Sequence, residues 1–257
     1  MTVYITAIGA IIGEHVEAFN PRKELPNRKH LKMMTRDVRL GIGAVVRAIE
    51  NCANFSDYAP PRRGLYVGGA PIAAEPEDLA RAVSAVTVDG KFDADAFGEK
   101  GIPCVPPLWL VKGLSNNIMG FSTHYFDIQG HNVNRCDGKW GSLAAVVDGY
   151  HAINEGRVDV AIVGGADSLV SAASWIGRPA SEAGLFLVLE RKSANAMAKI
   201  TAGGFTGDGV STTHPVDYGA ATGVLALYNR LQKLTDSEAV SVVDGTGAGA
   251  VVTLAPV

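Results

Sequence analysis

Short β-branched runs alternate with amphipathic segments along most of this chain. Residues 3–12 form an apolar run that is closed by Gly13, which predicts a buried strand at the start of the fold. Apolar side chains then recur at helical spacing between residues 38 and 49, after a possible cap at Thr35, and this spacing predicts a helix with one buried face.

The next hundred residues alternate in the same way but contain one segment without a clear pattern. Residues 64–70 predict a short strand that ends in glycines, and residues 77–86 predict a helix. Residues 88–102 mix charge, glycine and phenylalanine without a period, so we expect a loop or a lid insertion. Two prolines precede an apolar stretch at 108–119, which predicts a helix that begins at the prolines.

A sharper pattern follows between residues 133 and 163. A strand leads through a glycine turn at Gly138 and Gly141 into an amphipathic helix that stops at Gly156, and a nearly continuous apolar run follows at 158–163. This order predicts a right-handed βαβ unit. Further strands are predicted at 185–189, 198–205, 240–243 and 251–254, with a helix at 219–234. The class is therefore α/β with a mixed sheet.

Composition narrows the classes of protein that the chain can be. Of its 257 residues 47% are hydrophobic and 19% are charged, and the net charge is -3, as in a core-rich globular protein. No basic run suggests a nucleic-acid surface, and no apolar run or leader pattern suggests a membrane span or export. Three scattered cysteines fit neither a disulfide framework nor a metal site, so we expect a cytoplasmic protein without a bound metal.

The glycine turn before residue 141 is the candidate for chemistry. A side chain at a strand-to-helix turn is presented at a helix N-terminus, where free N–H groups stabilise negative charge on a nucleophile or an oxyanion. Here that side chain belongs to Lys139, whose cation is unfavourable at this end of a helix unless it is neutral, solvated or paired with an acid such as Asp137. The alternative is a purely structural turn with Lys139 in solvent.

The segment 130–169 resembles the central segment of the β-ketoacyl synthases, the condensing enzymes of the thiolase fold. The similarity is strongest at residues 154–167 (NEGRVDVAIVGGAD), where Asp167 stands in the place of a frequent glutamate. Residues 3–13, 38–51, 187–190 and 201–209 resemble further parts of the family. The resemblance implies one thiolase-like domain over residues 1–257, with a layered α-β-α fold, a mixed sheet and a second half that is reduced at about 198–257.

The departures from the family pattern lie at its catalytic residues. An ungapped count back from Gly156 places Lys139 at the position of the nucleophilic cysteine. The segment of the first catalytic histidine is missing, and the second histidine's position falls on Val216, two residues from His214. Cys136 precedes the turn on a predicted strand, where a buried thiol would be unreactive. We therefore expect no complete condensing site.

The resemblance then implies a noncatalytic subunit, of the kind called a chain length factor, that forms a heterodimer with a catalytic ketosynthase. Such subunits act on chains carried by the phosphopantetheine of an acyl carrier protein in type II polyketide, polyene or fatty-acid-like synthesis. Aryl polyene pathways are the narrower expectation, and no resident cofactor is implied. The strand before the turn is the expected dimer interface: Asn132, Val133, Asn134, Arg135 and Cys136. The helix after the prolines supplies the side chains expected to shape the acyl tunnel: Leu108, Trp109, Leu110, Val111 and Leu114.

Other functions fit the same sequence. An acyltransferase or a malonyl-carrier decarboxylase could use Lys139 as a hydrogen-bond donor. A standalone binder of acyl chains or carrier proteins would leave the same traces, and a homodimer through the same strand is geometrically equivalent to a heterodimer. Ordinary core packing is an equal explanation of the five apolar residues at 108–114.

Overall fold

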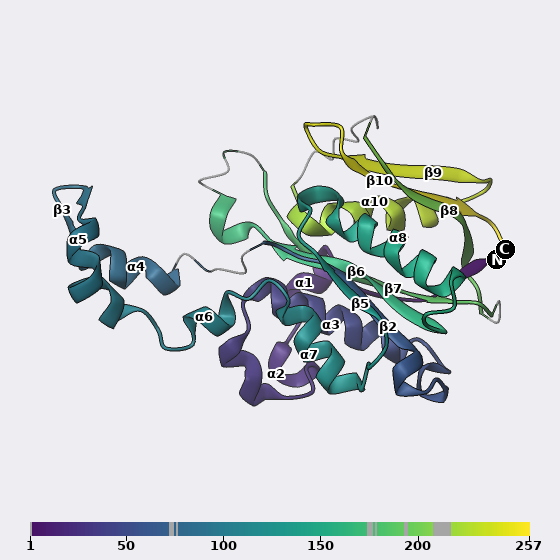
Figure 1. The fold of residues 1–257 in the computed structure, drawn as a ribbon, viewed down its shortest axis with the longest axis horizontal. Coiled ribbons are helices and arrows are strands. Elements are labelled where there is room, and N and C mark those ends of the chain that lie inside the picture. The colour runs from purple at the N-terminus through teal and green to yellow at the C-terminus, as the bar shows by residue number, and fades with distance from the viewer. Residues whose placement is uncertain are drawn as a thin grey trace.

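Eight strands form one mixed sheet in the order β5-β2-β6-β7-β1-β8-β10-β9 (Figure 1). The computed structural model describes residues 2–71, 75, 77–173, 177, 179–192, 195–207 and 217–257. The strands of the sheet are β1 (Val3–Ile11), β2 (Arg63–Gly68), β5 (Asn132–Arg135), β6 (Val160–Ser168), β7 (Glu182–Glu190), β8 (Ala198–Thr206), β9 (Glu238–Val243) and β10 (Gly249–Ala255).

Strand direction divides the sheet into two parts. Strand β2 pairs in parallel with β5 on one side and with β6 on the other. The pairs β6–β7, β7–β1, β1–β8, β8–β10 and β10–β9 are antiparallel. Among the described strands β5 pairs with β2 alone, so its outer edge is the edge of the sheet.

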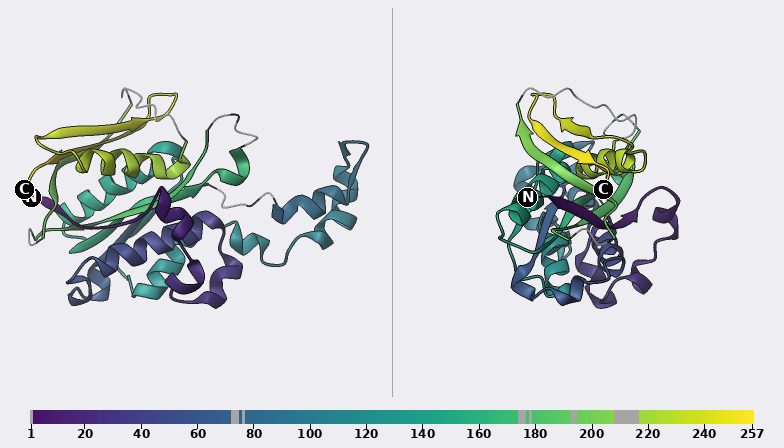
Figure 2. Two further views of the ribbon diagram at one scale, coloured as in Figure 1. Left: turned by 180° about the vertical axis from the view of Figure 1, so that it is seen from behind. Right: turned by 90° about the vertical axis from the view of Figure 1, so that its right-hand side faces the viewer.

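Helices cover both faces of the sheet and enclose two apolar cores. On one face α3 packs with α7, and this core contains Ile42, Val45 and Phe186. On the other face α8 and α10 lie between the central strands and the strands β8, β10 and β9, which curve around them (Figures 1 and 2). The helices are α1 (Glu14–Ala18), α2 (Pro21–Glu24), α3 (Arg36–Glu50), α4 (Glu77–Ser84), α5 (Ala94–Ala96), α6 (Trp109–Lys112), α7 (Asn117–Phe126), α8 (Gly141–Asn154) and α10 (Thr222–Leu231).

Shorter elements complete the chain. A two-stranded ribbon consists of β3 (Thr87–Val88) and β4 (Lys91–Phe92). The short helical turns are η1 (Arg28–Met33), η2 (Phe55–Asp57), η3 (Pro60–Arg62), η4 (Phe97–Gly101), η5 (Ile102–Cys104), η6 (Gly138–Trp140), η7 (Val170–Ala172) and η8 (Gly219–Ala221). No helix of the described ranges is long and apolar enough to span a membrane.

The predicted class, an α/β fold with a mixed sheet between helical layers, is confirmed. The predicted βαβ unit is β5-α8-β6, whose two strands lie on either side of β2. The helix begins within a residue of its predicted start, and Gly156 ends it with a φ of +74°. The one-domain boundary at 1–257 and the reduced second half stay predictions.

Two local predictions were wrong. The single helix expected over 108–119 is two helices, α6 and α7, because the side-chain amide of Asn117 donates to the carbonyl of Val111 (2.6 Å) at the end of α6. The segment 88–102, expected to be a loop, is built from a strand ribbon and helical turns that pack on α4. Each of these elements is too short for its apolar residues to show a period in the sequence.

Candidate functional site: the turn before α8

The turn that presents residue 139 joins the edge strand β5 to helix α8. Gly138 has a φ of +57°, a left-handed conformation that costs other residues free energy, and it is the first residue of the turn η6. At the start of α8 the buried hydroxyl of Ser142 accepts a hydrogen bond from the backbone N–H of Val224 (3.0 Å). This bond ties the start of α8 to α10.

A second glycine lets the end of β2 approach the same helix start. A Cβ atom on Gly68 would lie 2.3 Å from the backbone nitrogen of Ser142, a distance that no side chain tolerates. Only glycine therefore fits at this position, as expected where two backbones meet. The strand that leads into the turn is tied here as well, since the N–H of Gly69 donates to the carbonyl of Arg135 (2.9 Å).

Lys139 faces a buried carboxylate. Its Nζ lies 3.7 Å from Oδ2 of Asp217, and the side chains are 43% and 3% exposed, respectively. The other oxygen of Asp217 accepts the N–H of Gly219 (2.9 Å). The lysine thus has the ionic partner that a cation at a helix N-terminus requires, and this partner is Asp217, whereas Asp137 lies 3.6 Å from Arg135.

Asp167, near the end of β6, is a second buried carboxylate, and it contacts the start of η8. Its oxygens accept the N–H groups of Ala220 (2.9 Å) and Ser168 (2.8 Å). Burial raises the pKa of Asp167 to about 6; the backbone hydrogen bonds oppose the rise, and the nearby carboxylates of Asp37 and Asp217 add to it. Asp167 therefore gains a proton at mildly acidic pH, unlike an exposed aspartate.

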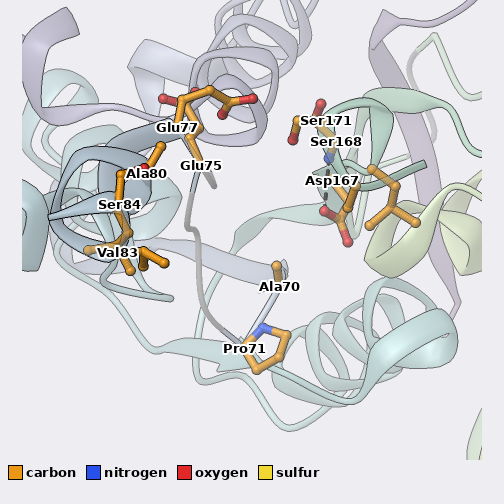
Figure 3. A pocket seen from close by; sticks show the side chains of 13 residues that line it. Ala70, Pro71, Glu75, Glu77, Ala80, Val83, Ser84, Asp167, Ser168 and Ser171 are labelled. Carbon is orange, nitrogen blue, oxygen red and sulfur yellow. Dashed lines mark hydrogen bonds between the residues drawn. The ribbon is translucent and has the colours of Figure 1, made fainter. Parts of the chain in front are cut away.

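A cavity of about 880 Å³ opens beside Asp167 (Figure 3). It lies between helix α4, the end of β2 and the segment that follows β6. Its lining surface is mainly apolar, with polar groups on both sides: Glu75, Glu77 and Ser84 at the α4 side and Asp167, Ser168 and Ser171 at the β6 side. A mainly apolar lining with a few polar groups is typical of sites for small organic ligands. The lining residues are Ala70, Pro71, Glu75, Glu77, Leu79, Ala80, Val83, Ser84, Asp167, Ser168, Leu169, Ser171 and Ala172.

The five residues predicted to form a dimer interface lie together on and just after β5. Arg135 pairs with Asp148 (2.7 Å) and its guanidinium lies over the ring of Phe205, 5.0 Å from the centroid. Cys136, expected to be a buried thiol, is exposed. The reason is that β5 ends at Arg135, so Cys136 lies in the turn.

The five residues predicted to shape an acyl tunnel lie around the short helix α6. Leu110, Val111 and Leu114 are 73%, 37% and 51% exposed, so these three are not core residues of this chain. The cavity beside Asp167 is lined by α4 instead of α6. Their role toward an acyl chain stays a prediction.

The other candidate catalytic groups are dispersed. The thiol of Cys52 lies near Glu190, and that of Cys104 lies near the carbonyl of Lys100 (3.5 Å). His131 bonds to Tyr66 and Arg157, both at 3.1 Å, and His30 and His124 lie in an aromatic cluster with Tyr125. His214 and Val216 lie outside the described residues.

Sequence reasoning missed Asp217 and the cavity. A signal for Asp217 was present, because an aspartate two residues before a glycine often accepts that residue's N–H in an Asx turn. The cavity had none, since its lining comes from three separate parts of the chain.

Comparison with known proteins gives a clear result for the fold. No protein-family model and no curated protein sequence matches this chain. Solved structures do match. A type II polyketide synthase acyl-carrier protein in complex with its ketosynthase bound to the hexaketide gives a TM-score of 0.77 at 14% identity, covering 100% of this chain and 99% of the matched one.

The chain has the ketosynthase fold. A β-ketoacyl synthase from Burkholderia phymatum STM815 aligns with a TM-score of 0.76 at 12% identity, and the ishigamide ketosynthase/chain length factor with 0.75 at 13%. Both alignments cover 100% of this chain and 99% of the other. In the ketosynthase fold of this chain, Lys139 stands at the turn before α8.

Proposed function

We propose that this chain is a noncatalytic ketosynthase-fold subunit that pairs with a catalytic ketosynthase and shapes its acyl tunnel. The observation that carries the proposal is the pairing of Lys139 with the buried Asp217 at the turn before α8. A condensing enzyme needs a thiolate there to take an acyl group from a thioester. An ammonium held by a carboxylate does not supply one.

The edge of the sheet supports the pairing. Among the described strands β5 is paired on one side only, and its outer edge is a template for a strand from another subunit. Its side chains are short or already neutralised, as Arg135 is by Asp148, so no free charge opposes strand addition there. A subunit of the same fold would present an equivalent edge.

The exposed apolar side chains on and just after α6 support the tunnel role. Leu110 and Leu114 are too exposed to stabilise this chain and would gain by burial in a partner at about 25 cal/mol per Å² of apolar area. A partner's acyl chain that reached them would meet an apolar wall. The type II polyketide or aryl polyene pathway is proposed on the sequence resemblance.

An acyl carrier protein is the second proposed partner. Five cations border one shallow depression on the segment 22–39: Arg22, Arg28, Lys29, Lys32 and Arg39. None of them forms an ion pair with a described residue, and the chain as a whole is negative. A concentrated positive surface favours an anionic partner such as a phosphopantetheine-bearing protein.

Co-expression with a cysteine-containing ketosynthase from the same source tests the pairing. Size-exclusion chromatography with light scattering is expected to give a one-to-one complex. Asn134→Lys places a charge on the β5 edge and should weaken the complex at least tenfold, while the matched control Ala239→Lys on the opposite edge strand β9 should leave it unchanged. A wild-type chain that ignores the ketosynthase would overturn the proposal.

A further inference from the structure

The cavity beside Asp167 takes no part in the proposed pairing or in the proposed tunnel. Its volume of about 880 Å³ lies within the range of about 300–1,000 Å³ that is common for sites of small organic ligands. Helix α4 forms one wall, the end of β6 and the residues after it form the opposite wall, and Ala70 and Pro71 lie between the two (Figure 3). This chain alone forms both walls.

The walls of the cavity suit an apolar body. Leu79, Ala80 and Val83 line it from α4, and Leu169 and Ala172 line it from the opposite wall. The side chain of Val83 is 41% exposed. An apolar ligand between the walls would remove this surface from water, which is favourable.

The charged groups of the lining are all negative. Glu75 and Glu77 line the cavity from the α4 side and Asp167 from the β6 side, and the described lining residues include no lysine, arginine or histidine. Glu75 is paired with Nζ of Lys112 (2.8 Å), whereas Glu77 and Asp167 form no ion pair with a residue that the structure describes. An anionic head group would therefore meet like charges, and a cation would meet carboxylates that lack a counter-ion.

The carboxyl group of Asp167 is held in place at the cavity wall. Its oxygens accept the N–H groups of Ala220 and Ser168, and each oxygen retains a lone pair for a further donor. The hydroxyl of Ser168 donates to Glu182 (2.7 Å), which in turn accepts two hydrogen bonds from Arg36. A ligand would not have to order this wall on binding, which favours affinity.

We propose that the cavity binds a small cationic amphiphile, with its ammonium group beside Asp167 and its apolar body along α4. The charge of the lining selects this class, because an alcohol with the same body would make the apolar contacts alone and a carboxylate would be repelled. The inference goes beyond the proposed function and does not depend on it, since it needs no ketosynthase. A chain that ignores a ketosynthase would leave it intact, and a chain that binds no amine would leave the proposed pairing intact.

Calorimetric titration of the full chain with octylamine, 1-octanol and octanoate at pH 7 tests the class of ligand. The three probes share one alkyl chain and differ only in the head group. We expect one octylamine per chain, with a dissociation constant at least tenfold below those of the other two probes. Octanoate that binds as tightly as octylamine, or a chain that binds no octylamine, would overturn the inference. Many weak octylamine sites would show partition onto the surface only and would overturn it as well.

The dependence of the affinity on pH tests the position of the ammonium group. The carboxylates near Asp167 are those of Asp37 on α3 and Asp217 before η8, with Glu75 and Glu77 on the other wall of the cavity. Burial raises the pKa of Asp167 to about 6, so this group is mostly protonated at pH 5 and mostly ionised at pH 7. The affinity for octylamine should rise at least threefold between these pH values, and Asp167→Asn should remove the rise. An affinity of the wild type that does not change with pH would overturn the inference.

Two matched variants test the position of the apolar body. Val83→Trp fills the cavity from α4 and should raise the dissociation constant of octylamine at least tenfold. The control Val88→Trp alters a valine of the β3–β4 ribbon that does not line the cavity, and should change the constant less than twofold. Both valines are exposed, so neither substitution should lower the melting temperature. Equal effects of the two variants on octylamine binding would overturn the inference.

Discussion

Nζ of Lys139 and Oδ2 of Asp217 lie 3.7 Å apart, at the turn between β5 and α8. Asp217 is almost fully buried and Lys139 is half-exposed. The lysine therefore offsets the cost of a buried negative charge, since a carboxylate in the interior needs a partner to remain ionised. We infer that Lys139 serves the structure of the turn.

Removal of the Lys139 cation should weaken the fold without affecting condensation by the complex. Lys139→Ala is expected to lower the free energy of unfolding by about 1 kcal/mol, because the pair is partly solvated. Lys139→Arg should retain most of this contribution to the free energy of unfolding. Denaturant unfolding checks this, with the exposed Lys23→Ala as the control; equal stability of the two alanine variants would contradict the structural role.

Asp167 should give the stability a distinctive pH dependence. Its pKa is raised by burial to about 6 in the folded chain from an ordinary 3.8, so the folded state holds a proton that the unfolded state has lost between these values. The resulting stabilisation is fully present below about pH 4 and is lost as pH rises through about 6.

Asp167→Asn tests this sign. Between pH 4 and 7 the free energy of unfolding of the wild type should fall by up to about 3 kcal/mol relative to that of Asp167→Asn. This corresponds to the rise of about two in the pKa of Asp167 on folding. Denaturant unfolding at several pH values measures it. A difference that does not change with pH would show that Asp167 titrates normally.

The thiols of Cys136 and Cys52 should differ sharply in their reactivity toward a maleimide. Cys136 is exposed, while burial raises the pKa of Cys52 to about 11 from 9.0, which leaves roughly a hundredfold less thiolate. Mass spectrometry of the labelled chain should therefore find Cys136 modified first and Cys52 modified only on unfolding. In the ketosynthase complex Cys136 should be protected, and rapid labelling there would contradict an interface at β5.

Changes of side-chain size on α6 and at Leu114, just after it, should alter the product of the complex. Leu114→Ala opens an apolar wall and is expected to lengthen the chain by at least one extension unit, while Leu110→Trp should shorten it. Mass spectrometry of the released chains measures both. Val170→Ala is the control, because this exposed residue lies in η7 and not near α6 in the chain. Identical products from all three variants would exclude α6 from the tunnel.

Most of the fold could be predicted from the sequence, because its strands and long helices carry their period in the chain. The βαβ unit around Gly138 and Gly156 is the clearest case. The break between α6 and α7 could not be predicted, since it depends on the side chain of Asn117 folding back on Val111. The pairing of Lys139 with Asp217 was missed for a similar reason: the two residues are brought together by the packing of η8 against η6, which are far apart in the chain.

Elongation of a malonyl-loaded carrier protein tests the central claim most directly. The reaction is measured with this chain alone, with its ketosynthase complex, and with the complex that contains Lys139→Ala. We predict no turnover by the chain alone, full turnover by the complex, and a rate within twofold for the Lys139→Ala complex. Turnover of acyl thioesters by the isolated chain that is abolished in Lys139→Ala would contradict a noncatalytic subunit and would show that Lys139 takes part in the chemistry.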